Sequence, residues 1–251
     1  MPFERVDNRQ ILEITGTDRE SFLQGLVTND VTKLKDGLVY AALLTPQGKY
    51  LADFFLVPQL EAIWIDVASE LAPGLKKRLT MYKLRADVAI APRELPVSRG
   101  LGEPPEGAFP DPRHSALGWR AYGIEGGDPV TDWDALRVAH LIPEAVSELK
   151  PDDSYILEMG FERLSGVDFK KGCYVGQEVT ARMKHKTELR KGLAQVSLTE
   201  ATKPGTPITA GGKPVGEVLS VAEDKALAYL RYDRAKGDME AGEAFLFRTD
   251  A

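Results

Sequence analysis

Cys173 is the only cysteine in the chain, and it lies in residues 169–178, which read FKKGCYVGQE. Lys171 precedes the thiol by two residues, and residues that favour a helix begin at Gln177. A lysine ammonium and a helix N-terminus both stabilise a thiolate, which is the form of cysteine that attacks electrophiles and binds metals. The alternative is a small buried side chain in a tight turn, because free cysteines are often buried. The residues alone leave both interpretations open.

Polar side chains follow the thiol along the predicted helix. Gln177 and Glu178 fall in its first turn, where they either contact a ligand beside the thiol or cap and pack the turn. Arg182 lies one turn beyond Glu178, so an intrahelical ion pair and a contact with an anionic ligand are both open. No histidine has metal-ligand spacing with Cys173 or with another histidine; the three are His114, His140 and His185.

The bulk composition limits the function classes. The chain has 251 residues, of which 43% are hydrophobic and 28% charged, as in an ordinary globular protein of one or two domains. Its net charge of −6 argues against broad, nonspecific binding to nucleic acid, which needs a basic surface. A single cysteine excludes an intrachain disulfide and a cluster held by four thiolates of the chain, so a cluster would need further ligands from elsewhere.

The start of the chain shows no targeting signal. Residues 1–13 are polar and charged, without the apolar core of a signal peptide or the character of a transit peptide. No apolar run approaches the length of a membrane span. A lone cysteine also fits a reducing compartment. We therefore expect a cytoplasmic protein without membrane association, and a monomer.

Strands and helices alternate before Cys173, a pattern that favours an α+β domain. Strands are expected at residues 9–14, 38–44, 50–57, 62–67, 86–91 and 117–122, and helices at 17–26, 71–83 and 131–141. Thr17 and Glu20 have the spacing of a capping box at the start of the first helix. Residues 92–112 are rich in proline and glycine and indicate an irregular excursion, or an edge hairpin near residues 95–97.

Two polar features of this region have both a structural and a functional interpretation. Asn29 and Asp30 follow the first helix and either cap the next turn or line a cleft. The helix at 71–83 and its end carry a basic face, for which a solvated surface is the expected role. Its cations are Lys76, Lys77, Arg78, Lys83 and Arg85.

The pattern changes after Arg182. Short strands are expected at residues 189–198, 212–221, 225–232 and 245–247, with glycine turns between them. Such spacing is typical of a small barrel or sandwich. We place the boundary near residue 186, which gives an α+β domain at residues 1–185 and a β-barrel domain at residues 186–251.

The segment KGCYVGQE at residues 171–178 resembles the signature Lys-Gly-Cys-Tyr/Phe-x-Gly-Gln-Glu of the YgfZ family. Further similar segments occur at residues 16–31, 44–49 and 82–85, so the resemblance covers nearly the whole chain and is weakest at 92–116. Members of this family resemble the glycine-cleavage T-protein, a folate-dependent aminomethyltransferase. They are associated with the assembly or repair of iron–sulfur clusters, chiefly of the four-iron type, and with tRNA modification.

The resemblance implies a fold, a site and partners. The fold would be the T-protein-like α+β fold with two lobes in residues 1–185, followed by a small C-terminal β-barrel. Cys173 and Lys171 would carry the chemistry. The cofactor cleft would be lined by Asn29, Asp30, Tyr174, Gln177, Glu178 and Arg182. The implied partners are A-type iron–sulfur carrier proteins and a ferredoxin.

Two departures from the T-protein pattern concern its folate. A carboxylate in a Leu-Arg-x-Glu-Ala-Gly helix recognises the pterin there, and this position is Ala139 here, where Glu144 or Glu158 could substitute. The T-protein aspartate that orients the reacting nitrogen also has no counterpart, since Asp66 precedes its position. The chain therefore looks closer to the mitochondrial and alphaproteobacterial-type branch of the family. Tetrahydrofolate remains a cofactor that the resemblance implies.

We expect an iron–sulfur cluster assembly or repair factor that supports the maturation of four-iron proteins. Cys173 would be a transient cluster ligand, or the thiol in cluster transfer, and Lys171 would favour its thiolate. Such a factor would be non-enzymatic or weakly catalytic. The alternatives are a tetrahydrofolate-dependent aminomethyltransferase or demethylase, and a module that binds a partner peptide in the cleft without a cofactor.

Overall fold

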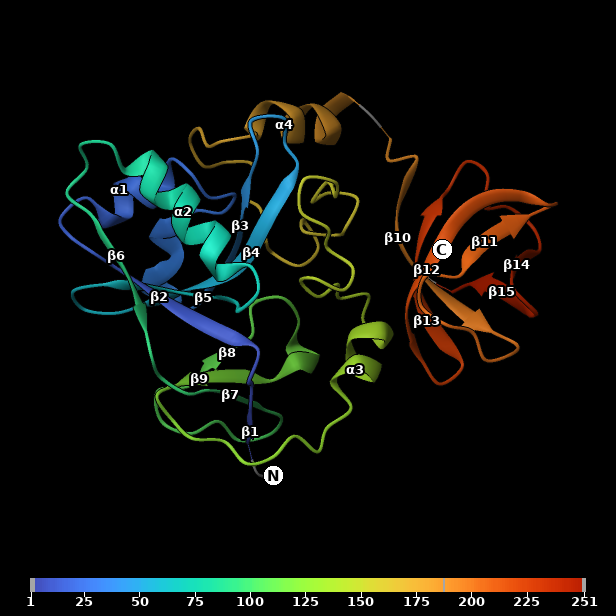
Figure 1. The fold of residues 1–251 in the computed structure, drawn as a ribbon, viewed down its shortest axis with the longest axis horizontal. Helices are drawn as coiled ribbons and strands as arrows, with labels where there is room; N and C mark the ends of the chain where they lie inside the picture. The colour runs from blue at the N-terminus through green and yellow to red at the C-terminus, as the bar shows by residue number, and fades with distance from the viewer. Residues whose placement is uncertain (1–2, 187, 250–251) are drawn as a thin grey trace. The chain divides into compact units, whose positions relative to one another are not determined.

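The computed structural model of the protein describes residues 3–186 and 188–249, with the side chain of residue 186 excepted. The chain forms two compact units. Unit 1 contains the chain up to Val130 together with Pro151–Asp153 and Glu162–Val179. Unit 2 contains Thr131–Lys150, Ser154–Phe161 and the chain from Thr180 onwards. Figure 1 shows the elements of each unit.

Unit 1 is built on a five-stranded antiparallel sheet with the order β3-β4-β5-β2-β6. Its strands are β2 (Arg9–Thr15), β3 (Val39–Leu44), β4 (Tyr50–Pro58), β5 (Ile63–Ala68) and β6 (Ala89–Arg93). One face is apolar, and α1 (Arg19–Gln24) and α2 (Ala72–Lys83) pack on it through Leu23, Leu75 and Leu79 (Figure 1). The 3₁₀-helix η1 (Val31–Asp36) follows α1 and adds Val31 to this core.

The opposite face of the sheet buries charged and aromatic groups. Asp66 on β5 is fully buried and accepts hydrogen bonds from Arg9 at 2.6 Å and from Arg120 at 2.8 Å. Tyr122 donates a third bond to this carboxylate at 2.9 Å. Burial raises the pKa of Asp66, but the two guanidiniums outweigh burial and hold the pKa at about 2. Asp53 accepts bonds from two buried tyrosine hydroxyls in the same way.

A second, smaller sheet contributes Arg120 and Tyr122. Its order is β1-β7-β9-β8, with β1 (Glu4–Arg5), β7 (Val97–Gly100), β8 (Phe109–Pro110) and β9 (Trp119–Tyr122), and the 3₁₀-helix η2 (Ser115–Leu117) precedes β9. The expectation of an edge hairpin near residues 95–97 is wrong, because β7 pairs with both β1 and β9 in the interior of this sheet. The strand predicted at 117–122 begins only at Trp119, after the 3₁₀ turn.

The predicted capping box at Thr17 does not form. The N-cap of α1 is Asp18, without a side-chain cap hydrogen bond. Thr17 instead donates its backbone N–H and its hydroxyl to Asp87, at 3.1 and 2.9 Å. The Asp87 carboxylate thus accepts the backbone N–H of Thr17 that a capping box would direct to Glu20. Glu20 is exposed.

Unit 2 contains a closed, antiparallel six-stranded barrel with the order β10-β13-β12-β11-β14-β15. The strands are β10 (Lys191–Leu198), β11 (Pro207–Ala210), β12 (Lys213–Ala222), β13 (Lys225–Arg231), β14 (Met239–Ala241) and β15 (Ala244–Arg248). The α+β class with a C-terminal barrel is therefore confirmed, although β11 and β14 were not predicted. Helix α4 (Gln177–Lys186) begins at the end of unit 1 and continues into unit 2.

Unit 2 also contains helix α3 (Trp133–Ala139), which packs on β12 and β13. Gln195 on β10 donates to the backbone oxygen of Val138 at 2.7 Å. The contact-based units thus place α3 with the barrel, whereas the linear boundary near residue 186 assigns it to the first domain.

Candidate functional site

Cys173 is an exposed residue in the loop that leads into α4. Of the two interpretations that the residues left open, the structure therefore favours an accessible thiol over a buried one. The loop is irregular from residue 166 to residue 176, and α4 begins four residues after the cysteine. What holds such a loop in place decides where the thiol lies.

Lys171 ties the cysteine loop to the loop after α1. Its side chain is buried, and its Nζ donates to three backbone oxygens: those of Gln24 at 2.8 Å, Val27 at 2.6 Å and Asn29 at 3.0 Å. An ammonium has three N–H donors, so this arrangement uses all of them. No hydrogen bond or ion pair joins Lys171 to Cys173 within the described part of the chain.

Burial lowers the pKa of Lys171 to about 8, although the carboxylates of Asp30 and Asp168 act in the opposite direction. The three backbone carbonyl groups take the place of the water molecules that would otherwise surround the ammonium of Lys171. This observation gives Lys171 an anchoring role, and its predicted effect on the thiolate stays a prediction.

The same two loops are joined by side-chain bonds of Thr28 and Asn29. The hydroxyl of Thr28 donates to the backbone oxygen of Gly166 at 2.7 Å. The backbone oxygen of Thr28 accepts the N–H of Asp168 at 3.0 Å. Asn29 donates to the oxygen of Ser165 at 2.6 Å and to that of Tyr40, on β3, at 2.8 Å. Asn29 is thus a buried connector of three segments.

Asp168 and Lys33 complete the connection at its edge. The Asp168 carboxylate accepts the backbone N–H of Lys170 at 2.6 Å and pairs with Lys33 at 2.7 Å. Lys33 also donates to the side-chain oxygen of Asn29 at 3.0 Å. We call this set of Gln24, Thr28, Asn29, Lys33, Asp168 and Lys171 the loop anchor.

Asp30 caps η1. Its carboxylate accepts the backbone N–H and the hydroxyl of Thr32, at 3.0 and 2.8 Å, and the side-chain amide of Gln24 at 3.0 Å. The bond from the Thr32 hydroxyl lowers the pKa of Asp30 against the effect of burial. For this residue, capping is therefore the role that its contacts describe.

The second half of the motif docks on the turn between β3 and β4. Gly176 has φ +84°, and a Cβ there would lie 2.6 Å from the backbone oxygen of Thr45. No larger residue fits this contact without displacing the backbone. Tyr174 is buried, with its ring centre 5.1 Å from the Nζ of Lys171, a distance suited to a cation–π contact.

The remaining predicted site residues lie on α4. Gln177 is half-buried, and its N–H bonds the oxygen of Tyr174 at 3.2 Å, so it closes the turn before the helix. Glu178 and Arg182 are exposed. The ion pair between them, one of the two roles left open for Arg182, is absent among the salt bridges of the described residues.

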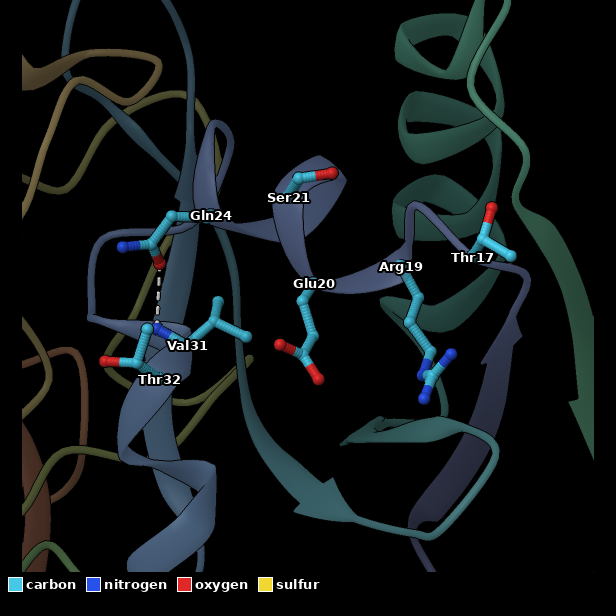
Figure 2. Close-up of a pocket in the computed structure, with 7 residues that line it drawn as sticks. All are labelled: Thr17, Arg19, Glu20, Ser21, Gln24, Val31 and Thr32. Carbon is cyan, nitrogen blue, oxygen red and sulfur yellow. Dashed lines mark hydrogen bonds between the residues drawn. The ribbon is translucent and has the colours of Figure 1, made fainter.

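A pocket of about 460 Å³ lies beneath α1, next to the loop anchor (Figure 2). It is lined by Thr17, Arg19, Glu20, Ser21, Gln24, Val31 and Thr32. Figure 2 shows the Glu20 carboxylate between the side chains of Arg19 and Val31. Gln24 belongs both to the pocket and to the loop anchor. The backbone oxygen of Gln24 accepts from Lys171, and the side-chain oxygen of Gln24 accepts from the N–H of Val31 at 2.8 Å.

The carboxylates nearest in sequence to Ala139 already have partners within the protein, so they do not fit the role of recognising a pterin. Arg137 and Ser220 both donate to Glu148, so this carboxylate is occupied. Glu158, one of the two proposed substitutes, is buried and accepts from Tyr229 at 2.5 Å. Glu144, the other, lies 3.8 Å from the Arg137 guanidinium. We derive no step through folate from this arrangement.

The described residues contain no group of three or more His, Cys, Asp or Glu side chains placed to hold a metal ion. In the described residues, no helix is long and apolar enough to cross a membrane.

Sequence reasoning missed four members of the anchor: Gln24, Thr28, Lys33 and Asp168. One signal was available, since Asp168 precedes Lys171 by three residues and can accept the intervening N–H groups. The partners of Lys171 gave no signal in the sequence, because they are backbone oxygens of residues 142 to 147 positions away.

Comparison with solved structures identifies the fold. The crystal structure of glycine cleavage system aminomethyltransferase T from Bartonella henselae matches with a TM-score of 0.75, covering 99% of this chain and 84% of that chain. The sequences are only 13% identical, so the match concerns the fold alone. It confirms the predicted T-protein-like architecture. In addition, the family model of the CAF17 C-terminal β-barrel domain matches residues 190–248.

Two mammalian proteins are similar over most of this chain. The mitochondrial iron–sulfur cluster assembly factor IBA57 of Homo sapiens is 30% identical over 280 residues, which cover 94% of this chain and 79% of the human protein. The Mus musculus protein of the same name is 30% identical over 282 residues with the same coverage. The homolog from Mycosarcoma maydis is 30% identical over 81% of this chain and 58% of its own length.

These relatives correct two expectations. All three are named as mitochondrial proteins, which overturns the cytoplasmic assignment. They also fit the mitochondrial half of the expected branch, and none supports its alphaproteobacterial half. Because the human relative is 30% identical over 79% of its own length, this chain belongs to the IBA57 family of iron–sulfur cluster assembly factors, of which YgfZ proteins are also members.

Proposed function

We propose that this protein takes part in the assembly of iron–sulfur clusters and supports the maturation of four-iron proteins, with Cys173 as a transient ligand of the cluster in transit. The observation that carries the proposal is an exposed thiol on a loop whose base is fixed by the buried Lys171. The names of its relatives support the role in iron–sulfur cluster assembly.

Accessibility and position are both needed for this role. A cluster bound to a carrier protein can be approached only by a thiol at the surface, and the thiolate is the form that binds iron. Because one thiolate does not complete the coordination of a cluster, the other ligands must stay on the carrier. We therefore infer a shared cluster. The thiol of Cys173 loses its proton to solvent and its thiolate forms one bond to iron, while one ligand of the carrier leaves that iron and takes up a proton from solvent.

The partners proposed for this step are an A-type iron–sulfur carrier, as the cluster donor, and a ferredoxin, as the electron source for a four-iron product. This choice follows the family resemblance alone. Assistance to tRNA modification would be indirect, through enzymes that contain four-iron clusters.

The test is anaerobic mixing of the protein with a cluster-loaded A-type carrier, followed by visible absorption and circular dichroism. Wild type is expected to change the cluster spectrum on mixing, and Cys173→Ser to lose at least nine tenths of this change. Gly172→Ala is the matched control, because a Cβ at this position meets no atom within 4 Å and the thiol is retained. Full restoration of four-iron enzyme activity by Cys173→Ser in a deletion strain would refute the role of the thiol.

Tetrahydrofolate stays a secondary candidate as a ligand. Ala139 offers a methyl group where a T-protein offers a carboxylate, so we expect at most weak binding. Titration calorimetry with tetrahydrofolate on wild type and on Ala139→Glu tests this inference. Tight binding by the wild type would favour the one-carbon transferase instead.

A further inference from the structure

The outward face of helix α2 carries charges that unit 1 does not use. Residues 71–86 contain no acidic residue and five cations: Lys76, Lys77, Arg78, Lys83 and Arg85. None of the five takes part in a salt bridge among the described residues. Lys83 lowers the pKa of Asp87, after two hydrogen bonds from Thr17.

Most of these cations add little to the helix that carries them, and Lys83 lies in its last turn, where a cation complements the helix dipole. Helical ion pairs form three or four residues apart, and α2 offers no carboxylate at such a spacing. Its first turn also lacks the acidic residues that complement a helix dipole, and its N-cap Leu71 makes no side-chain bond. Lys83 interacts electrostatically with Asp87, and Arg78 lines a pocket together with Glu70 and Asp152. The exposed cations Lys77 and Arg85 are therefore the ones most open to a partner outside the chain.

Two large apolar side chains stand among the cations. Met81 is 63% exposed and Leu84 is 88% exposed. Lys77 and Met81 lie one helical turn apart on the same face of α2, and Leu84 follows as the C-cap of the helix. We call these three residues the stripe. Leu84 also has φ +46°, a conformation that is strained for a leucine. Leu84 ends α2 as its C-cap, but its exposed side chain adds little to the core, so this side chain is available for a contact outside the chain.

A recess lies beside the stripe. This pocket, of about 260 Å³, is lined by α2 on one side and by strands β3 and β4 on the other. Its apolar lining residues are Leu43, Leu51, Ala52, Leu71 and Leu75. Its charged lining residues are Arg78, Glu70 and Asp152. Gly74 forms part of the wall, and a Cβ there would meet no atom within 4 Å.

We propose that this face of α2 is a docking surface for an acidic protein. Carboxylates of the partner would lie against Lys77, Arg78 and Arg85, while an apolar side chain of the partner enters the recess at Gly74. Met81 and Leu84 supply the exposed apolar centre that protein interfaces surround with polar groups. The chain as a whole carries a net charge of −6, so a local basic face also orients an acidic partner during approach.

The surface favours a protein over other anions. A recess sized for one side chain has no use on a lipid surface, and two apolar residues make a small membrane anchor. Binding of single-stranded nucleic acid generally uses exposed aromatic rings, and the aromatic residue of α2, Tyr82, is half-buried against the core. Vesicles and RNA therefore serve as the competing probes.

The inference rests on the proposed function only for the choice of protein probes, which are an A-type carrier and a ferredoxin. Their binding to the full-length protein is measured by calorimetry at 50 mM and 300 mM NaCl. Gly74→Leu, which fills the recess from an open position, and Leu84→Gly, which relieves the positive φ, are each expected to weaken binding at least tenfold. Neither variant should lower the melting temperature, so misfolding would not explain the loss.

Leu60→Gly is the matched control, because Leu60 is 95% exposed in the β4–β5 loop and does not line the recess. It should bind like the wild type. Unchanged binding by both α2 variants, or no binding of either protein by the wild type, would overturn the proposal. Binding through α2 to anionic vesicles or duplex RNA instead of the proteins would also overturn it. Binding by Cys173→Ser at wild-type affinity, together with the loss of binding in the α2 variants, would separate this surface from the proposed thiol chemistry.

Discussion

Unit 1 contains two populations of cations with opposite surroundings. Arg9, Arg120 and Lys171 are buried, and each is satisfied by carboxylate or carbonyl oxygens from distant parts of the chain. The cations of α2 are near the surface and have no salt bridge within the described residues. A buried charge without partners costs several kcal/mol, so the first population is fixed by folding. The second costs the fold little, which leaves it available for a partner.

The largest effect is expected where a buried carboxylate is removed. Asp66→Ala strands the guanidiniums of Arg9 and Arg120, and breaking such a buried pair should cost about 3–5 kcal/mol in the free energy of unfolding. Urea denaturation measures it. Asp128→Ala is the control, because Asp128 pairs with Arg5 at the surface and its removal should leave the urea midpoint unchanged. Equal effects of the two changes would contradict the comparison.

Lys171→Met removes the donor from three backbone oxygens while keeping much of the side-chain volume. Unsatisfied buried acceptors should cost about 2–3 kcal/mol. Hydrogen exchange of residues 165–175 should also become faster, since the cysteine loop loses its anchor. Lys170→Met, one residue earlier and exposed, is the control. Slow exchange in both variants would show that Thr28 and Asn29 suffice to hold the loop.

Acid should weaken unit 1 through Asp66. Its pKa in the folded protein is about 2, below the ordinary value of 3.8, so its stabilising effect is complete above about pH 4 and is lost as the pH falls towards 2. The loss amounts to roughly 2 kcal/mol. Urea midpoints measured at pH 7, 4 and 3 test the sign. Asp66→Asn should show a shallower decline than the wild type.

The smallest effect is expected on α2. Lys77→Gln should change the free energy of unfolding by less than about 0.5 kcal/mol, because an exposed cation without an internal partner adds little to stability. Its effect should be seen only in binding, which should become less sensitive to salt. A clear loss of stability in this variant would show that the fold does use the α2 charges.

The sequence predicted one class of feature well. Apolar periodicity and glycine turns located most strands of both units, and the motif placed the cysteine ahead of α4. Local hydrogen-bond spacing failed where a distant group competed, as at Thr17, whose donors go to Asp87. It failed also at β7, because pairing on both sides of a short strand depends on residues at least 19 positions away in the sequence.

By itself, the sequence determined the α+β class, the barrel, the single thiol and the family. Only the tertiary structure decided that the thiol is exposed, that Lys171 serves as an anchor, and that the α2 cations lack salt bridges within the described residues. The physical reason lies in the partners. Backbone carbonyls are the same at every position, so no residue type marks which of them will receive a buried ammonium. That choice is made by the approach of two loops about 140 residues apart in the chain.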